Sequence, residues 1–210
     1  MPIQWIQVLR SRSLAAVLAV IAVAGVAFAQ APAHVDAWAT LVAKRRVTFA
    51  SAAAFPASSG AVVDPAANRI TINSATARLT VLTGPKENMM AFKIDGLINP
   101  EIMVHRGARL TLTVINVDGD MMHNFMLTRQ GPPYPAMPAM MGKGMTMGKS
   151  MSMTASGSMG SGMLAPHRAK APYVASRLLI RAAQPAKGYY LCAARGHAKA
   201  GMFGRFTVEP

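Results

Sequence analysis

The chain has 210 residues, a formal net charge of +14, 52% hydrophobic residues and one cysteine. A single cysteine excludes an intramolecular disulfide, a four-thiolate zinc site, an iron–sulfur cluster and a copper centre bridged by two cysteines. The basic residues are scattered rather than gathered in runs. This distribution argues for solubility and electrostatic steering of partners, and against nucleic acid binding.

The N-terminus has the order of an export signal. Arg10 and Arg12 precede an apolar run over residues 14–28, and residues 27–29 have the small-x-small pattern of a cleavage site. The run is shorter than the roughly 20 residues that a membrane-spanning helix needs. We therefore predict a Sec-type signal peptide over residues 1–29, a periplasmic mature protein and no stable membrane insertion after cleavage. An uncleaved membrane anchor is the alternative.

The mature chain divides into an N-terminal extension and one β domain. Trp38, Leu41 and Val42 have i, i+3, i+4 spacing, which predicts a helix over residues 34–46, within a helix and linker that occupy residues 30–66. From residue 67 to 210 the apolar period changes to two. Strands are expected over residues 68–73, 77–83, 89–96, 109–117, 123–128, 176–182, 188–193 and 202–209. Short strands punctuated by Gly, Pro and Asp predict an all-β fold, an antiparallel β-sandwich or barrel.

A methionine-rich insertion interrupts this domain. Residues 137–163 contain nine methionines among Gly, Ser, Lys and Thr, which predicts a mobile loop. Three interpretations stay open: a tolerated insertion, a docking surface that adapts to partners, and weak capture of Cu(I) by clustered thioethers. The thioethers in question belong to Met145, Met147, Met151 and Met153.

The single cysteine lies in the stretch YYLCAARGHAKAGMF, at the end of a predicted strand. There Cys192, His197 and Met202 form a Cys-x4-His-x4-Met pattern. One thiolate, two imidazoles and a weak axial thioether make a blue-copper electron-transfer site, so this pattern needs a second imidazole from elsewhere. Two other interpretations of the cysteine are a buried structural thiol and the nucleophile of a Cys–His pair.

Four histidines could supply that imidazole: His34, His105, His123 and His167. We favour His123, because it follows the turn DGD at a junction between loop and strand, as the cysteine loop does. Asn124 comes next, and its amide can bond across to the cysteine loop and orient the ligands.

Three stretches resemble one known family: GYYLCAARGHAKAGMFGRFTVE, GPPYPAMP and HRGARLTLTVINVDGDMMHNFMLT. They are similar to the rusticyanins, the blue copper proteins of acidophilic iron oxidisers, and to the related sulfocyanins. The resemblance covers nearly all of the mature chain except the methionine-rich insertion. Asn124 is a departure, since rusticyanins have Ser there, and the insertion is a second departure.

The resemblance implies a cupredoxin-like β-sandwich over residues 67–210 with one type 1 copper. The implied ligands are His123, Cys192, His197 and Met202. It also implies a redox partner such as a c-type cytochrome or a terminal oxidase.

We therefore expect an exported, monomeric electron carrier rather than an enzyme. The edge of His197 would pass the electron, with Arg195 and Lys199 orienting the partner. The alternative is a periplasmic copper-handling protein, for storage, delivery or tolerance, that uses the methionine-rich loop.

Overall fold

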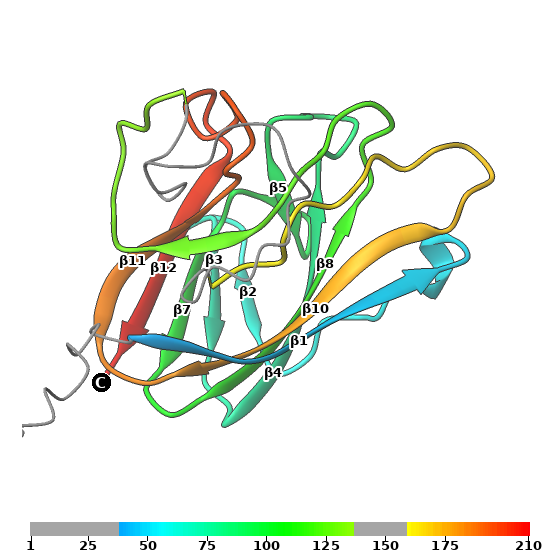
Figure 1. The fold of residues 1–210 in the computed structure, drawn as a ribbon. Coiled ribbons are helices and arrows are strands. Elements are labelled where there is room, and N and C mark those ends of the chain that lie inside the picture. Colours follow the sequence, from blue (N-terminus) through cyan, green and yellow to red (C-terminus); the bar gives the residue numbers. More distant parts are fainter. Residues whose placement is uncertain (1–37, 137–158) are drawn as a thin grey trace, which may run out of the picture. The chain divides into compact units, whose positions relative to one another are not determined.

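A computed structural model describes residues 38–136 and 159–210, which form two six-stranded sheets packed as a β-sandwich (Figure 1). In the first sheet the order is β1 (Ala39–Phe49), β10 (Tyr173–Ala182), β8 (Arg109–Asn116), β4 (Thr76–Thr83), β5 (Phe92–Ile94) and β6 (Leu97–Ile98). In the second it is β2 (Val62–Asp64), β3 (Arg69–Ile72), β7 (Glu101–His105), β12 (Phe203–Glu209), β11 (Ala186–Leu191) and β9 (Met126–Thr128). A 3-10 turn, η1, spans Ala52–Ala54.

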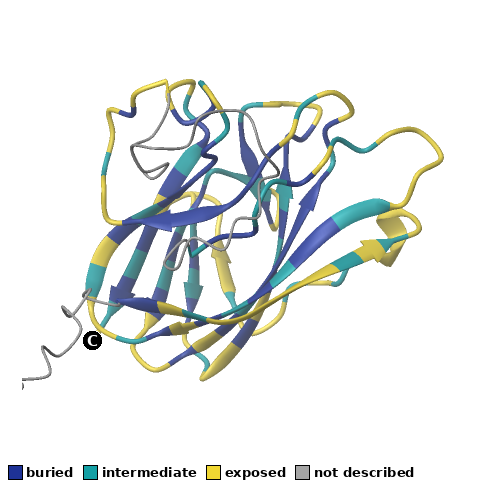
Figure 2. Ribbon diagram, viewed as in Figure 1, coloured by how far each residue is buried: buried dark blue, intermediate teal, exposed yellow. Residues whose placement is uncertain are grey.

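The core lies between the sheets because the strands bury alternate side chains (Figure 2). Leu110, Leu112 and Val114 of β8 point inward, as the period of two predicts. Phe206 and Val208 of β12 do the same from the opposite sheet. Each fully buried side chain of this size stabilises the fold by roughly 1.5–3 kcal/mol.

An aromatic cluster lies where the two sheets approach the predicted site. The rings of Phe125 and Tyr190 stack at a centroid distance of 5.1 Å, and Phe92 packs edge-on against both. The Tyr190 hydroxyl donates a hydrogen bond to the Pro100 carbonyl oxygen at 2.6 Å, which satisfies this buried polar group. Phe125 is two residues after His123 and Tyr190 is two before Cys192. The cluster therefore anchors both of these segments on one core.

The prediction of a helix over residues 34–46 is wrong from Ala39 onward, where β1 begins. This edge strand pairs antiparallel with β10 from Ala39 to Phe49, with a bulge between Leu41 and Ala43. Its backbone hydrogen bonds to a distant strand outweigh a weak helical periodicity. Residues 34–37 lie outside the described part of the chain. Because β1 and β2 both precede residue 67, the sandwich begins N-terminal to the predicted domain boundary.

The sandwich is confirmed, but both sheets are mixed rather than antiparallel throughout. The pairs β4–β8, β3–β7 and β7–β12 are parallel, and the other pairs are antiparallel. Alternation along one strand does not report the direction of its neighbour. The short strands β2, β6 and β7 were not among the predicted elements.

The methionine-rich insertion is described only at its C-terminal end. Residues 137–158 lie outside the described part of the chain, as does the predicted signal peptide. Ser161 is buried, and it exchanges hydrogen bonds with Phe125 through its backbone N–H and its hydroxyl. The Met159 carbonyl oxygen accepts from the N–H of Leu127 at 2.9 Å. Hydrogen bonds therefore hold the last residues of the predicted loop beside β9.

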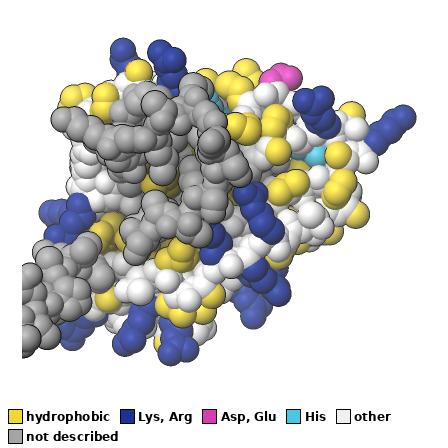
Figure 3. Space-filling view, in the orientation of Figure 1, with side chains coloured by type: hydrophobic (Ala, Val, Ile, Leu, Met, Phe, Trp, Pro, Cys, Tyr) yellow, Lys and Arg dark blue, Asp and Glu magenta, His cyan; other side chains and the backbone are white. Residues whose placement is uncertain are grey.

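The surface is strongly basic, with 22 Lys and Arg residues against eight Asp and Glu residues in the whole chain. Figure 3 shows Lys and Arg side chains over much of the described surface on one face, and little carboxylate. Among the described residues, no helix is both long and apolar enough to cross a membrane.

Candidate metal centre

The cysteine loop is a compact turn between the last two strands. Cys192 follows β11 directly and Met202 precedes β12 directly, and the Cys192 N–H donates to the Met202 carbonyl oxygen at 3.1 Å. The pairing of β11 with β12 thus continues to the base of the loop. Gly196 and Gly201 have φ of +86° and +101°, a region where other residues are strained. These two glycines let the chain return within ten residues with His197 inside the loop.

His123 reaches the same place from the loop between β8 and β9. The backbone N–H and C=O of His123 both form hydrogen bonds with the backbone of Leu164. These two bonds fix the position of the His123 backbone. The side chain is 0% exposed.

Three ligand atoms converge. The Cys192 Sγ lies 3.4 Å from His197 Nδ1 and 3.9 Å from His123 Nδ1, and the two Nδ1 atoms are 3.2 Å apart. Atoms bound ~2.0–2.3 Å from one ion, at angles of roughly 100–130°, lie ~3.1–4.0 Å from each other. The three separations therefore fit a single metal ion held by one sulfur and two nitrogens.

The donor set indicates which metal. Two imidazoles and one thiolate in a trigonal arrangement are typical of blue copper, because sulfur favours Cu(I) and imidazole suits both oxidation states. The cluster of His123, Cys192 and His197 suits one copper ion and is buried on all three members. A four-sulfur site is impossible with one cysteine.

The structure places the other two predicted site residues beside this cluster. The Asn124 Oδ1 accepts from the Ala193 N–H at 2.7 Å, and its backbone N–H donates to the Cys192 Sγ at 3.4 Å. Asn124 therefore ties the segment of His123 to the cysteine loop. Met202 is fully buried, and its backbone N–H donates to the His197 carbonyl oxygen at 3.0 Å. That bond fixes the backbone from which its thioether extends.

Asp118 is a site residue that the sequence reasoning missed. Its Oδ2 lies 3.0 Å from His123 Nε2, and both side chains are buried. The sequence DGD predicts a turn and no contact with a ligand. The available signal was an acidic residue five positions before a candidate ligand, in a chain with only eight acidic residues.

Burial and charge set the protonation of the cluster. Burial lowers the pKa of His123, against the hydrogen bond and the charge of Asp118, which raise it. Burial also lowers the pKa of His197, and the neighbouring His123 lowers it further, against the charge of Asp118, which raises it. The lowered pKa of each ring favours the neutral imidazole, the form that binds metal. Burial raises the pKa of the Cys192 thiol, with hydrogen bonds from the Asn124 and Ala194 N–H groups opposing it.

The pKa of Asp118 is lowered even though its burial alone would raise it. The hydrogen bond to His123 and those from the N–H groups of Asp120 and Met121 outweigh the burial. The carboxylate is thus kept ionised beside the ring.

Two of the remaining histidines, His105 and His167, do not join the cluster. His105 is exposed on β7, with Nδ1 3.4 Å from the Pro210 carbonyl oxygen, and His167 stacks on Tyr173 at a ring distance of 3.6 Å. His34 lies outside the described residues. So do the predicted Cu(I) ligands Met145, Met147, Met151 and Met153.

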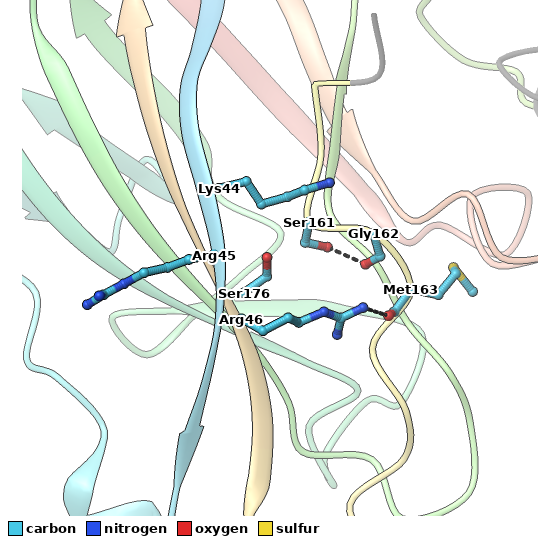
Figure 4. A pocket seen from close by; sticks show the side chains of 7 residues that line it. All are labelled: Lys44, Arg45, Arg46, Ser161, Gly162, Met163 and Ser176. Carbon is cyan, nitrogen blue, oxygen red and sulfur yellow. Dashed lines mark hydrogen bonds between the residues drawn. The ribbon is translucent and has the colours of Figure 1, made fainter. Parts of the chain in front are cut away.

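A separate hollow lies between β1 and residues 161–163. Figure 4 shows Lys44 and Arg46 reaching toward that segment while Arg45 points away, and Arg46 donates to the Met163 carbonyl oxygen at 2.7 Å. No member of the metal cluster lines this hollow. It is therefore a basic surface feature apart from the ligand atoms.

Fold and cluster together have the arrangement of a cupredoxin-like β-sandwich, whose last two strands carry a Cys–His loop that faces a second histidine. No protein-family profile matches the chain. The particular resemblance is to rusticyanin. Among solved structures, rusticyanin from Thiobacillus ferrooxidans has a TM-score of 0.58 and 22% identity, over 71% of this chain and 86% of that one. Reduced rusticyanin gives the same TM-score at 20% identity, over 80% of this chain and 100% of the other. The resemblance to rusticyanin predicted from sequence is confirmed, and the chain has the fold of these rusticyanin structures.

Curated relatives are rusticyanins too. Those of Acidithiobacillus ferrooxidans and Acidithiobacillus ferridurans are each 28% identical over 123 residues, which is 57% of this chain and 55% of the relative. The chain thus spans about half the length of the curated relatives that it matches.

Proposed function

We propose that this protein is a blue copper electron carrier. The observation that carries the proposal is the convergence of Cys192 Sγ, His123 Nδ1 and His197 Nδ1 in a buried cluster. The names of the relatives support it, since one solved rusticyanin is described as a copper protein. When bound, the copper supplies one-electron chemistry between Cu(II) and Cu(I). Met202 would be the weak axial ligand, because it is buried at the base of the same loop.

The chain's own part is to hold the ligands still. His123, Cys192 and His197 belong to segments fixed by backbone hydrogen bonds, so little movement accompanies a change of charge. His197 is 7% exposed, against 0% for Cys192 and His123, so its edge is the proposed route for the electron. The exposed Arg195 and Lys199 flank it and would orient an acidic surface of the partner.

We also propose that the protein works after export, as a monomer. The predicted signal peptide supports export, and the proposed partners are redox proteins such as a c-type cytochrome or a terminal oxidase. Transfer of one electron needs no bound substrate, so we infer a carrier rather than an enzyme.

Replacing Cys192 with Ser tests the proposal. The copper-loaded protein should be intensely blue, from charge transfer between the thiolate and Cu(II), and Cys192→Ser should abolish the colour. Ser is close to Cys in size, so the metal-free variant should keep its circular dichroism spectrum and unfold cooperatively. A Cys192→Ser protein that remains blue, or a wild-type protein that binds Cu(II) without the colour, would refute the assignment.

A further inference from the structure

Both carboxylate oxygens of the buried Asp118 make contacts, and only one of them faces His123. Asp118 Oδ1 accepts from the backbone N–H groups of Asp120 at 2.8 Å and Met121 at 3.0 Å. Its Oδ2 faces His123 Nε2 at 3.0 Å. An ionised carboxylate can only accept hydrogen bonds. The 3.0 Å contact therefore requires a proton on Nε2, which leaves the lone pair of His123 on Nδ1, the nitrogen that faces Cys192 and His197.

The carboxylate itself is held from behind. The Asp118 N–H donates to the Asn116 Oδ1 at 3.0 Å, and the Asn116 amide nitrogen bonds the carbonyl oxygens of Met121, Leu164 and Ala165. Gly84 closes the other side, since a Cβ there would lie 2.6 Å from Asp118 Cβ and 2.7 Å from His123 Nε2. These contacts hold the Asp118 carboxylate and the His123 ring in one relative orientation.

We propose that Asp118 is a positioning residue that selects the tautomer and orientation of His123 and places one buried negative charge behind the metal site. A partner of this kind on the outer nitrogen of a ligating histidine fixes the ring and raises its basicity. The proposal rests on the proposed function only for its effect on copper. Its effect on the ring applies to the metal-free protein as well.

The negative charge of Asp118 should lower the reduction potential of a bound copper. A bound Cu(II) carries one more positive charge than Cu(I), so a nearby carboxylate stabilises the oxidised form more. Removing that charge should raise the reduction potential, with a shift in the ratio of reduced to oxidised protein of about tenfold or more at fixed ambient potential.

Asp118→Asn is a sharp test because an amide has one acceptor and one donor group. The two backbone N–H groups at the Oδ1 position favour the amide oxygen there. The NH₂ group would then face His123 Nε2, which must become the acceptor. The proton moves to Nδ1, where it opposes metal binding.

The matched control is Asp120→Asn. It removes the same formal charge from the same turn, but the Asp120 side chain is exposed and makes no described contact with His123.

The first measurement is ¹⁵N NMR of the histidine rings in the metal-free full chain, at neutral pH. Wild type and Asp120→Asn should show His123 protonated at Nε2, and Asp118→Asn should show it protonated at Nδ1. Wild-type His123 protonated at Nδ1 would overturn the proposal. This measurement needs only wild-type protein, so it remains decisive if Asp118→Asn does not fold.

The second measurement is on the copper-loaded proteins. Asp118→Asn should weaken Cu(I) affinity about 10–100-fold in competition with a Cu(I) chelator, and should raise the reduction potential. Asp120→Asn should change neither. An unchanged potential in Asp118→Asn, or an equal rise in Asp120→Asn, would overturn the role of the buried charge. If wild type forms no blue site but the NMR results hold, the proposed function fails and the positioning role of Asp118 stands.

Discussion

Truncating Asn124 to Ala should destabilise the metal-free protein through one identifiable hydrogen bond. The Asn124 side chain is 2% exposed, and its Oδ1 is the acceptor for the N–H of Ala193, which is 8% exposed. In Asn124→Ala that N–H has no partner in a place that water barely reaches. An orphaned buried donor costs about 1–3 kcal/mol. For a domain of this size, a loss of 2 kcal/mol lowers Tm by about 4–8 °C.

The control for this prediction is Asn88→Ala. The Asn88 Oδ1 also accepts a backbone N–H, that of Met90 at 3.0 Å, but Asn88 is exposed and water can replace it. Surface changes of this kind usually stay within about 0.5 kcal/mol. Urea unfolding of the metal-free proteins gives both free energies of unfolding, and an unchanged m-value checks that only stability has changed.

If Asn124→Ala and Asn88→Ala lose the same free energy, or if Asn124→Ala loses less than about 0.5 kcal/mol, the amide does not hold the two segments together. If it does hold them, Asn124→Ala should also release copper faster, because the cysteine loop is then tied less firmly to the segment of His123.

Two further predictions concern Met202 and the insertion. Met202→Leu should keep copper bound but raise the reduction potential in cyclic voltammetry, because losing a fourth donor destabilises Cu(II) more than Cu(I), which tolerates fewer ligands. An unchanged or lowered potential would count against Met202 as the axial ligand. Deleting residues 142–157 should leave the blue spectrum and Tm nearly unchanged. Deleting residues 142–162 should instead lower the free energy of unfolding by about 1–4 kcal/mol, because it also removes the hydrogen bonds of Met159 and Ser161 to the segment of Phe125. Mass spectrometry should count one Cu(I) in the intact chain and in the shorter deletion; several in the intact chain, falling to one, would instead favour the copper-handling alternative.

The sandwich could be predicted from the sequence because its central strands bury alternate residues on a pleated surface. Ile70 and Ile72 of β3 are both buried, and the intervening Thr71 is not, so the local pattern carries the whole signal. In β1 the pattern gave the wrong answer. Leu41 is partly exposed and Val42 is 56% exposed, so the apolar spacing that resembled a helix does not mark a buried face. Strand β1 forms because its backbone pairs with β10. The local sequence of β1 contains no information about that distant partner.

The metal cluster, like the sandwich, could be predicted only where the signal is local in the sequence. Cys192 and His197 are close in sequence, so their spacing carries chemical meaning before folding. His123 is 69 residues away from Cys192, and only its place after a turn and the family resemblance pointed to it. Asp118 could not be assigned, because a carboxylate in a turn usually faces water. Its burial depends on Asn116 and Gly84, which the chain brings together only when β4 and β8 pair.

These contacts show that the fold itself brings the ligand residues together. The rings of His123 and His197 present Nδ1 toward a buried thiol, with separations close to those around one ion. Metal binding must displace the thiol proton, because burial raises the pKa of Cys192 and a bound metal requires the thiolate. A rigid frame with one proton to displace suits a site that must keep its shape through repeated changes of charge. In this frame Asp118 and Asn124 have different tasks: Asp118 fixes one ring, and Asn124 fixes the distance between the two ligand-bearing segments.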